Sequence, residues 1–241
     1  MPIAVPIDIY RIEDTDEVEL ILSSRRWVAG LAAFHVVAFV VADVAEGLAE
    51  LIADGLGLPR VDALGASFGG RWLLDAAARH PARFAHLVLA NTFARSAEVS
   101  RHPLFDIGSL QQRGPEETKA AWAVTLDASP RSELRDLQRV LLEEQPAAVL
   151  HHRLMSVATA PDGPDLDERL GVGIIECADD PLIPPDTQAD LRRRISGAAI
   201  VRLRTGGHYP HVVAVQAYVA ALRGILAGPS DARPQREAVI G

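Results

Sequence analysis

Cysteine is nearly absent from the 241-residue chain, which contains only Cys177. A single cysteine cannot form an intramolecular disulfide, so a secreted scaffold held together by disulfides is excluded. Basic residues are also in deficit: 24 lysines and arginines stand against 32 aspartates and glutamates, for a formal net charge of −8. This acidic balance argues against nucleic acids and anionic membranes as partners, because both are bound through basic patches.

Long hydrophobic runs are missing as well. The longest uncharged apolar stretch, Trp27–Ala42, has 16 residues and includes Gly30 and His35, whereas a membrane-spanning helix needs about 20. The first residues lack the basic start and long apolar stretch of a signal peptide. With 49% hydrophobic and 23% charged residues, the chain can bury a sizeable core and is not intrinsically disordered. We therefore expect a soluble, cytoplasmic protein without a membrane span.

Short apolar strands alternate with helices in two parts of the chain. The predicted strands are β-branched or aliphatic runs at 35–41, 61–64, 87–90, 172–177 and 198–203. The predicted helices cover about 43–55, 71–79, 187–195 and 211–226. This alternation predicts an α/β fold, with a mostly parallel sheet and helices on both faces.

Residues 96–170 interrupt this pattern, because they contain several helical segments and no convincing strand. We predict that they form a helical cap, or lid, inserted into an α/β core made of residues 1–95 and 171–226. Residues 227–241 are rich in proline, serine and charge, and we expect a flexible tail there.

The segment Gly65–Gly69 reads Gly-Ala-Ser-Phe-Gly and matches the pattern G-x-S-x-G. It follows a predicted strand and begins a predicted helix, which is the context of a nucleophile elbow. The glycines would allow a tight turn that leaves the hydroxyl of Ser67 at the carboxyl edge of the sheet. The backbone N–H of Phe68 would then point toward a developing oxyanion. An ordinary glycine-rich turn is the alternative interpretation.

A serine nucleophile needs a base, and the base needs an acid that orients it. Asp179, Asp180 and His208 each follow a predicted strand, and parallel strands bring their carboxyl ends to one edge of the sheet. We predict that Ser67 attacks an acyl carbon, that His208 transfers the proton, and that Asp180 orients the imidazole. Asp179 and Asp180 could instead be turn formers, and His211 competes with His208. No histidine pair has a zinc-binding spacing, so we expect neither a metal nor another cofactor.

These residues resemble the α/β-hydrolase family over about 35–95 and 171–226. Val61–Gly70 looks like the nucleophile strand and elbow of that family, and 87–92 looks like its next strand. Ala178–Pro185 is similar to its acid loop, a match that implies Asp180 as the acid. The sequence Gly-Ala-Ser-x-Gly-Gly, together with Thr-Gly-Gly and Tyr-Pro around His208, resembles the maspardin-like branch, which implies a binding protein more than a proven enzyme.

The N-terminal part departs from the family pattern. Strands are predicted at 6–11 and 17–22, followed by a helix at 25–34. Only about 12 residues separate residue 22 from residue 35, too few for the strand, oxyanion loop and helix expected there, because one crossover takes about a dozen residues. We expect this part to be shortened. Either 17–22 carries the oxyanion loop, at Ser23, Ser24 or Arg25, or that unit is lost.

The sequence therefore predicts a serine hydrolase that cleaves a small ester or related acyl substrate through an acyl-enzyme. Apolar residues of the predicted lid would favour a hydrophobic acyl or alcohol group; they are Leu104, Phe105, Trp122 and Leu126. A non-catalytic α/β-hydrolase-like binding protein is the alternative, supported by the missing oxyanion unit.

Overall fold

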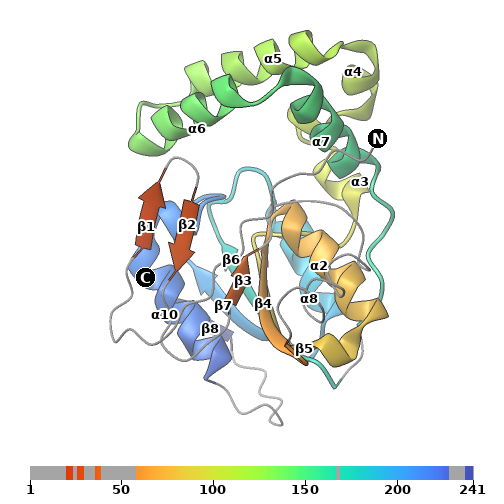
Figure 1. Cartoon of the computed structure of the whole chain (residues 1–241), viewed down its shortest axis with the longest axis vertical. Helices are drawn as coiled ribbons and strands as arrows, with labels where there is room; N and C mark the ends of the chain where they lie inside the picture. The colour runs from red at the N-terminus through yellow and green to blue at the C-terminus, as the bar shows by residue number, and fades with distance from the viewer. Residues whose placement is uncertain are drawn as a thin grey trace. The chain divides into compact units, whose positions relative to one another are not determined.

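The computed structural model describes residues 58–166 and 169–227, together with the backbone of four short strands at 20–23, 26–29, 36–38 and 237–240. Its elements are drawn in Figure 1. The contacts within the chain divide it into two units. One consists of Met1–Ala94 and Gly163–Gly241, and the other of Arg95–Asp162.

The first unit is built on a six-stranded parallel sheet with the order β3-β4-β5-β6-β7-β8. The strands are β3 (Val36–Ala38), β4 (Val61–Ala66), β5 (Phe84–Ala90), β6 (Gly171–Cys177), β7 (Ala199–Leu203) and β8 (Glu237–Ile240). Because all strands run in the same direction, the segments that follow β4, β5, β6 and β7 leave from one edge. The predicted mostly parallel α/β sheet is confirmed.

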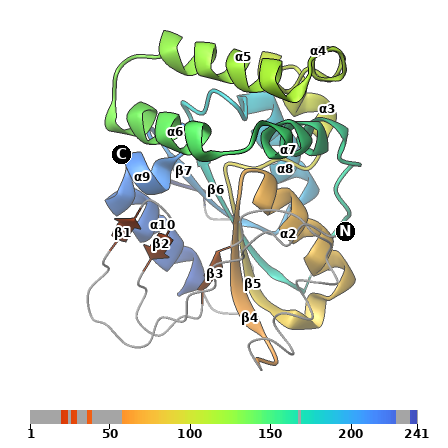
Figure 2. The same cartoon turned by 45° about the horizontal axis from the view of Figure 1, so that its top comes forward.

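Helices cover both faces of this sheet (Figures 1 and 2). The helices of this unit are α2 (Phe68–Arg79), η2 (Pro81–Arg83), α8 (Pro185–Arg194), α9 (Pro210–Val213) and α10 (Val215–Leu226). On one face, Leu73 of α2 and Leu191 of α8 pack with Leu87 and Ile174. On the other face, Leu222 and other residues of α10 form a second core with the opposite side chains of the same strands. This two-sided burial explains why the strands read as continuous apolar runs.

Near the N-terminus, β1 (Leu20–Ser23) and β2 (Arg26–Ala29) form a separate two-stranded antiparallel sheet. The helix predicted at 25–34 is therefore wrong over 26–29. Trp27 and Val28 are of types that favour strands, and the preceding strand supplies the pairing partner that the sequence alone does not reveal. The predicted strand at 6–11, the helix at 43–55 and most of the segment predicted to be shortened lie outside the described residues.

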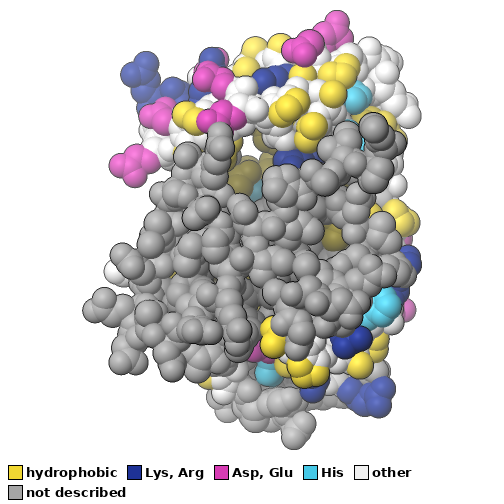
Figure 3. Space-filling model, in the orientation of Figure 1, with side chains coloured by type: hydrophobic (Ala, Val, Ile, Leu, Met, Phe, Trp, Pro, Cys, Tyr) yellow, Lys and Arg dark blue, Asp and Glu magenta, His cyan; other side chains and the backbone are white. Residues whose placement is uncertain are grey.

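The second unit, Arg95–Asp162, consists of helices and their connections. They are α3 (Ser96–Val99), η3 (Pro103–Phe105), α4 (Ile107–Gln112), α5 (Pro115–Ala128), α6 (Glu133–Glu144) and α7 (Ala147–Thr159). Helix α5 packs on α6 and α7. The face of this unit visible in Figure 3 mixes acidic, basic and hydrophobic side chains, so no continuous basic patch forms on it.

Two boundaries differ from those expected. The chain rejoins the sheet unit at Gly163, whose N–H donates to the carbonyl of Ala94 over 2.6 Å, and Leu166 and Leu170 pack against the core beyond it. These residues lack regular structure, which is why the sequence pattern extended the cap to residue 170. Within the predicted tail, residues 237–240 form β8 beside β7. A short apolar stretch becomes a strand there because an edge is available to pair with.

Candidate active site

Ser67 lies alone in the sharp turn between β4 and α2. Its backbone has φ 52° and ψ −129°, and a positive φ is costly for a residue with a side chain. Hydrogen bonds hold this conformation: the N–H of Ser67 donates to the carbonyl of Ala90 over 2.9 Å, and the hydroxyl of Thr92 donates to the carbonyl of Ser67. The strained turn predicted from G-x-S-x-G is therefore held by the end of β5.

Gly65 of the motif and Gly70, which directly follows it, permit close packing of the strand against the helix. A Cβ atom on Gly65 would lie 2.7 Å from Cα of Gly70, and a Cβ atom on Gly70 would lie 2.7 Å from Cβ of Thr92. Both distances are far shorter than a van der Waals contact. Neither glycine has a positive φ. These positions therefore need glycine because there is no room for a Cβ atom, and not because of their backbone conformation.

Three side chains from distant parts of the chain form one hydrogen-bonded series. The Nε2 atom of His208 lies 2.8 Å from Oγ of Ser67. The Nδ1 atom of His208 lies 2.9 Å from Oδ2 of Asp180 and 3.1 Å from its Oδ1. His208 and Asp180 are each 7% exposed. The structure thus brings together the serine, histidine and aspartate that the sequence singled out.

The carboxylate of Asp180 determines which imidazole nitrogen carries the proton. Its Oδ1 already accepts backbone N–H groups from Leu182 (2.8 Å) and Ile183 (3.1 Å), so the carboxylate acts as a hydrogen-bond acceptor toward this loop. An ionised carboxylate can only accept, so Nδ1 of His208 donates to it and Nε2 is left to accept the hydroxyl proton of Ser67. This arrangement suits a general base.

Asp179, the alternative acid, contacts backbone instead of imidazole. Its carboxylate accepts the N–H of Gly206 (3.2 Å) and the N–H of Gly207 (2.8 Å). It therefore holds the loop that leads to His208. Of the two adjacent aspartates, Asp180 is the one that contacts the histidine.

His211, the alternative base, occupies a different environment. Its ring centroid lies 5.9 Å from that of Tyr209 and 5.8 Å from that of Tyr218. Burial, and secondly the neighbouring His208, lower the pKa of His211 from its ordinary 6.5 to about 4. His211 is therefore neutral above this pH, and the imidazole that accepts the hydrogen bond from Ser67 is that of His208.

The lowered pKa of His211 predicts a pH-dependent stability. Between pH 6.5 and 4 the unfolded chain binds a proton at this site that the folded protein excludes, so the free energy of unfolding falls as the pH falls through this window. The full loss at low pH is of the order of 3 kcal/mol. Urea titrations from pH 7 to pH 4 should show a steeper decline for the wild type than for His211→Phe. The exposed His152 provides the control, His152→Gln, which should follow the wild type; identical slopes for all three proteins would contradict the prediction.

Phe68 is the first residue of α2, so its backbone N–H has no acceptor within the helix and lies beside Ser67. Its ring is held by Phe93 and Trp72, with centroids 6.3 Å and 5.5 Å away. Of the positions proposed for a second oxyanion donor, 24 and 25 lie outside the described residues, and only the backbone of Ser23 is described. The second donor stays unassigned.

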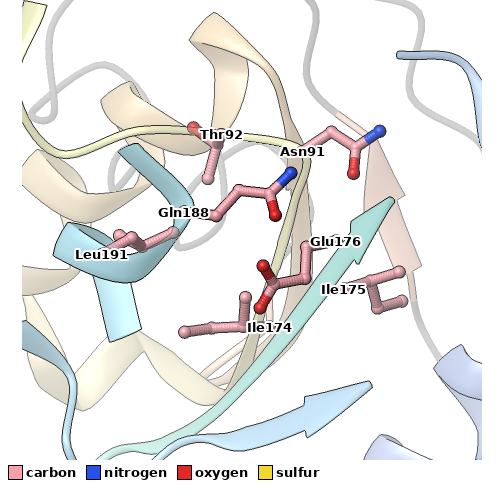
Figure 4. A pocket seen from close by; sticks show the side chains of 7 residues that line it. All are labelled: Asn91, Thr92, Ile174, Ile175, Glu176, Gln188 and Leu191. Carbon is pink, nitrogen blue, oxygen red and sulfur yellow. The ribbon is translucent and has the colours of Figure 1, made fainter. Parts of the chain in front are cut away.

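A small cavity lies between β6, the segment after β5, and α8 (Figure 4). Its space is comparable to that of one water molecule. It is lined by Asn91, Thr92, Ile174, Ile175, Glu176, Gln188 and Leu191. Its buried carboxylate, Glu176, is bound by Arg192 over 2.6 Å. The cavity contains no member of the Ser67 series and is too small for an acyl substrate.

The described part of the chain has neither a grouped set of metal ligands nor a membrane-spanning helix. Among its residues, no three histidine, cysteine, aspartate or glutamate side chains are grouped so as to hold a metal ion. No described helix combines the length and apolar character needed to cross a bilayer.

Comparisons with known proteins agree with the fold of the chain. A family model described as "Alpha/beta hydrolase family" matches residues 22–221, whereas no curated protein matches the chain. Among solved structures, a hydrolase from Pseudomonas aeruginosa PA01 is 24% identical with a TM-score of 0.57, over 76% of this chain and 71% of that one. A thermophilic esterase from Thermogutta terrifontis is 21% identical with a TM-score of 0.58, over 78% and 73%. The enol-lactonase from Burkholderia xenovorans LB400 is 19% identical with a TM-score of 0.55, over 77% and 74%. At these identities the likeness extends to the fold alone.

Proposed function

The chain belongs to the alpha/beta hydrolase family, and on this premise we propose that it is a serine hydrolase that cleaves a small ester or a related acyl compound. The observation that supports this proposal is the hydrogen-bonded series from Ser67 through His208 to Asp180. A hydroxyl, an imidazole and a carboxylate in this order are the groups needed to activate a serine nucleophile.

The proposed reaction has two halves. In the first, Oγ of Ser67 attacks the acyl carbon while Nε2 of His208 takes the hydroxyl proton, and the carboxylate of Asp180 stabilises the imidazolium. His208 then returns the proton to the departing alcohol, leaving an acyl-enzyme on Ser67. In the second half, His208 takes a proton from water, the resulting hydroxide displaces the acyl group, and Ser67 regains its proton. The Phe68 N–H stabilises the oxyanion in both halves.

The substrate that we propose is a small acyl compound. Phe105 and Leu126, two of the apolar residues predicted to favour a hydrophobic group, are each only 7% exposed, so most of their surface is already used in packing. The esterase and the lactonase named above act on acyl compounds, and an ester or lactone is the class of substrate that we propose. No cofactor is needed for any step.

A non-catalytic binding protein of the maspardin-like kind is the second candidate. The observation that favours it is the short stretch of sequence between residues 22 and 35, which leaves little room for a second oxyanion donor; losing one such donor lowers the rate by about 10²–10³-fold. Such a protein would keep the fold and the three side chains without completing the reaction.

Labelling with a fluorophosphonate distinguishes the two candidates. We expect the wild-type protein to become covalently phosphonylated, with mass spectrometry locating the adduct on Ser67, and His208→Ala to react far more slowly. Circular dichroism of each sample controls for folding. A folded wild-type protein that stays unlabelled at high probe concentration would favour the binding protein.

A further inference from the structure

The side chain of Asn91 connects the strand that precedes the acid with the loop that carries the base. Asn91 directly follows β5 and is 3% exposed. Its Oδ1 accepts the backbone N–H of Cys177 over 3.0 Å, and its Nδ2 donates to the carbonyl of Gly207 over 2.7 Å. In Figure 4 its terminal amide points away from Gln188. Both polar atoms of this amide therefore make a hydrogen bond, the oxygen with β6 and the nitrogen with the loop before His208.

The loop that receives this bond has little rigidity of its own. Gly206 and Gly207 adopt φ values of 137° and 56°, in a region that glycine enters freely, so other conformations cost this dipeptide little. The carboxylate of Asp179 accepts the N–H groups of both glycines, and the side chain of Asn91 donates to the carbonyl of Gly207. This carbonyl belongs to the peptide group whose nitrogen is that of His208. The orientation of this peptide group consequently determines the position from which the His208 side chain extends.

We propose that Asn91 is a positioning residue, which orients the Gly207–His208 peptide so that the imidazole lies between Asp180 and Ser67. The proposal rests on the proposed function, in which this alignment limits proton transfer. Asn91 itself touches none of the reacting atoms. A displacement of the imidazole by about 1 Å can lower a rate by about 100-fold, so a bond made to the backbone next to His208 can affect catalysis.

Asparagine suits position 91 better than other amino acids of similar size. Aspartate keeps an acceptor for the N–H of Cys177 but has no donor for Gly207, and its charge would face a carbonyl oxygen. Asn91 also has a φ of 42°, a left-handed conformation that asparagine and glycine tolerate better than most residues. Asn91→Gly therefore removes the side chain without adding backbone strain, and Asn91→Asp removes chiefly the donor.

Two measurements test the proposal, one of which does not depend on activity. In proton NMR spectra, the Nδ1 proton of His208 that is shared with Asp180 should give a downfield resonance, identified by its absence from His208→Ala. We expect this resonance to be lost or broadened in Asn91→Gly and Asn91→Asp. We also expect the fluorophosphonate to label both variants about 10- to 100-fold more slowly than the wild type. Phe84→Leu, at the other end of β5 and fully buried, controls for a loss of stability and should change neither readout.

A double variant separates positioning from a general structural role. If Asn91 acts through His208, Asn91→Gly should slow labelling no further in a His208→Ala background. An equal slowing in both backgrounds would overturn the proposal, as would an unchanged resonance in Asn91→Gly or its absence from the wild type. If the wild type is not labelled at all, the proposed function fails, and the resonance alone decides whether Asn91 positions His208.

Discussion

Replacing Ser67 by alanine should lower kcat/KM for a short p-nitrophenyl ester by about 10⁴- to 10⁶-fold, because the variant has no group that can form an acyl-enzyme. The change should leave the fold intact. Alanine keeps the Cβ atom, and the hydrogen bond from the residue's N–H to Ala90 does not involve the side chain. Initial rates measured with purified wild type and variant test this expectation.

The control for this experiment is Ser156→Ala, in the helical unit. The hydroxyl of Ser156 donates to the carbonyl of His152, four residues earlier in the same helix, so its loss should leave kcat/KM within about 2-fold of the wild type, a surface substitution having little effect. If Ser67→Ala kept a tenth of the wild-type activity, the hydrolysis would have to come from another nucleophile.

Replacing Asp180 by asparagine should lower kcat by about 10⁴-fold, as loss of the correct imidazole tautomer does in serine proteases. Oδ1 of Asp180 accepts two backbone N–H groups, so the carbonyl oxygen of an asparagine would take that position and its NH₂ would face His208. Nδ1 would then have to accept, and Nε2 would carry the proton. A protonated Nε2 cannot remove the proton of Ser67.

The neighbouring aspartate provides a matched comparison. Asp179→Asn removes a charge one residue away but leaves the partner of His208 in place, and Asp179 contacts only backbone N–H groups. We expect kcat to fall by about 10-fold or less, because the asparagine oxygen can still accept one of the two N–H groups. Equal losses for the two variants would show that negative charge near His208, and not its tautomer, is what the site requires.

The parallel sheet and the convergence of three side chains could be predicted because both follow from patterns that extend over several residues. Each strand is an apolar run, and parallel strands place the segments after Ala66, Cys177 and Leu203 at one edge. The choice of Asp180 over Asp179 needed the resemblance of the acid loop, since both residues satisfy the spacing. The catalytic roles of these residues stay a prediction.

The contacts of Asn91 could not be predicted in the same way. They join it to Cys177 and Gly207, 86 and 116 residues later in the chain, and no local pattern specifies either bond. A polar residue directly after a buried strand, at the edge where Ser67 was expected, was the one available signal. Short strands such as β2 and β8 were missed for a related reason: four residues become a strand only when a partner edge is present.

The hydrogen bond between Gly163 and Ala94 has a consequence for how proteins of this kind diversify. It joins the residue that precedes a 68-residue insert, Arg95–Asp162, directly to the residue that follows it. A different insert joined at those two points, longer, shorter or of another composition, would not have to stretch or shift the strands that precede Ser67 and Asp180. The helical unit can thus differ in length or composition while the sheet unit keeps its structure.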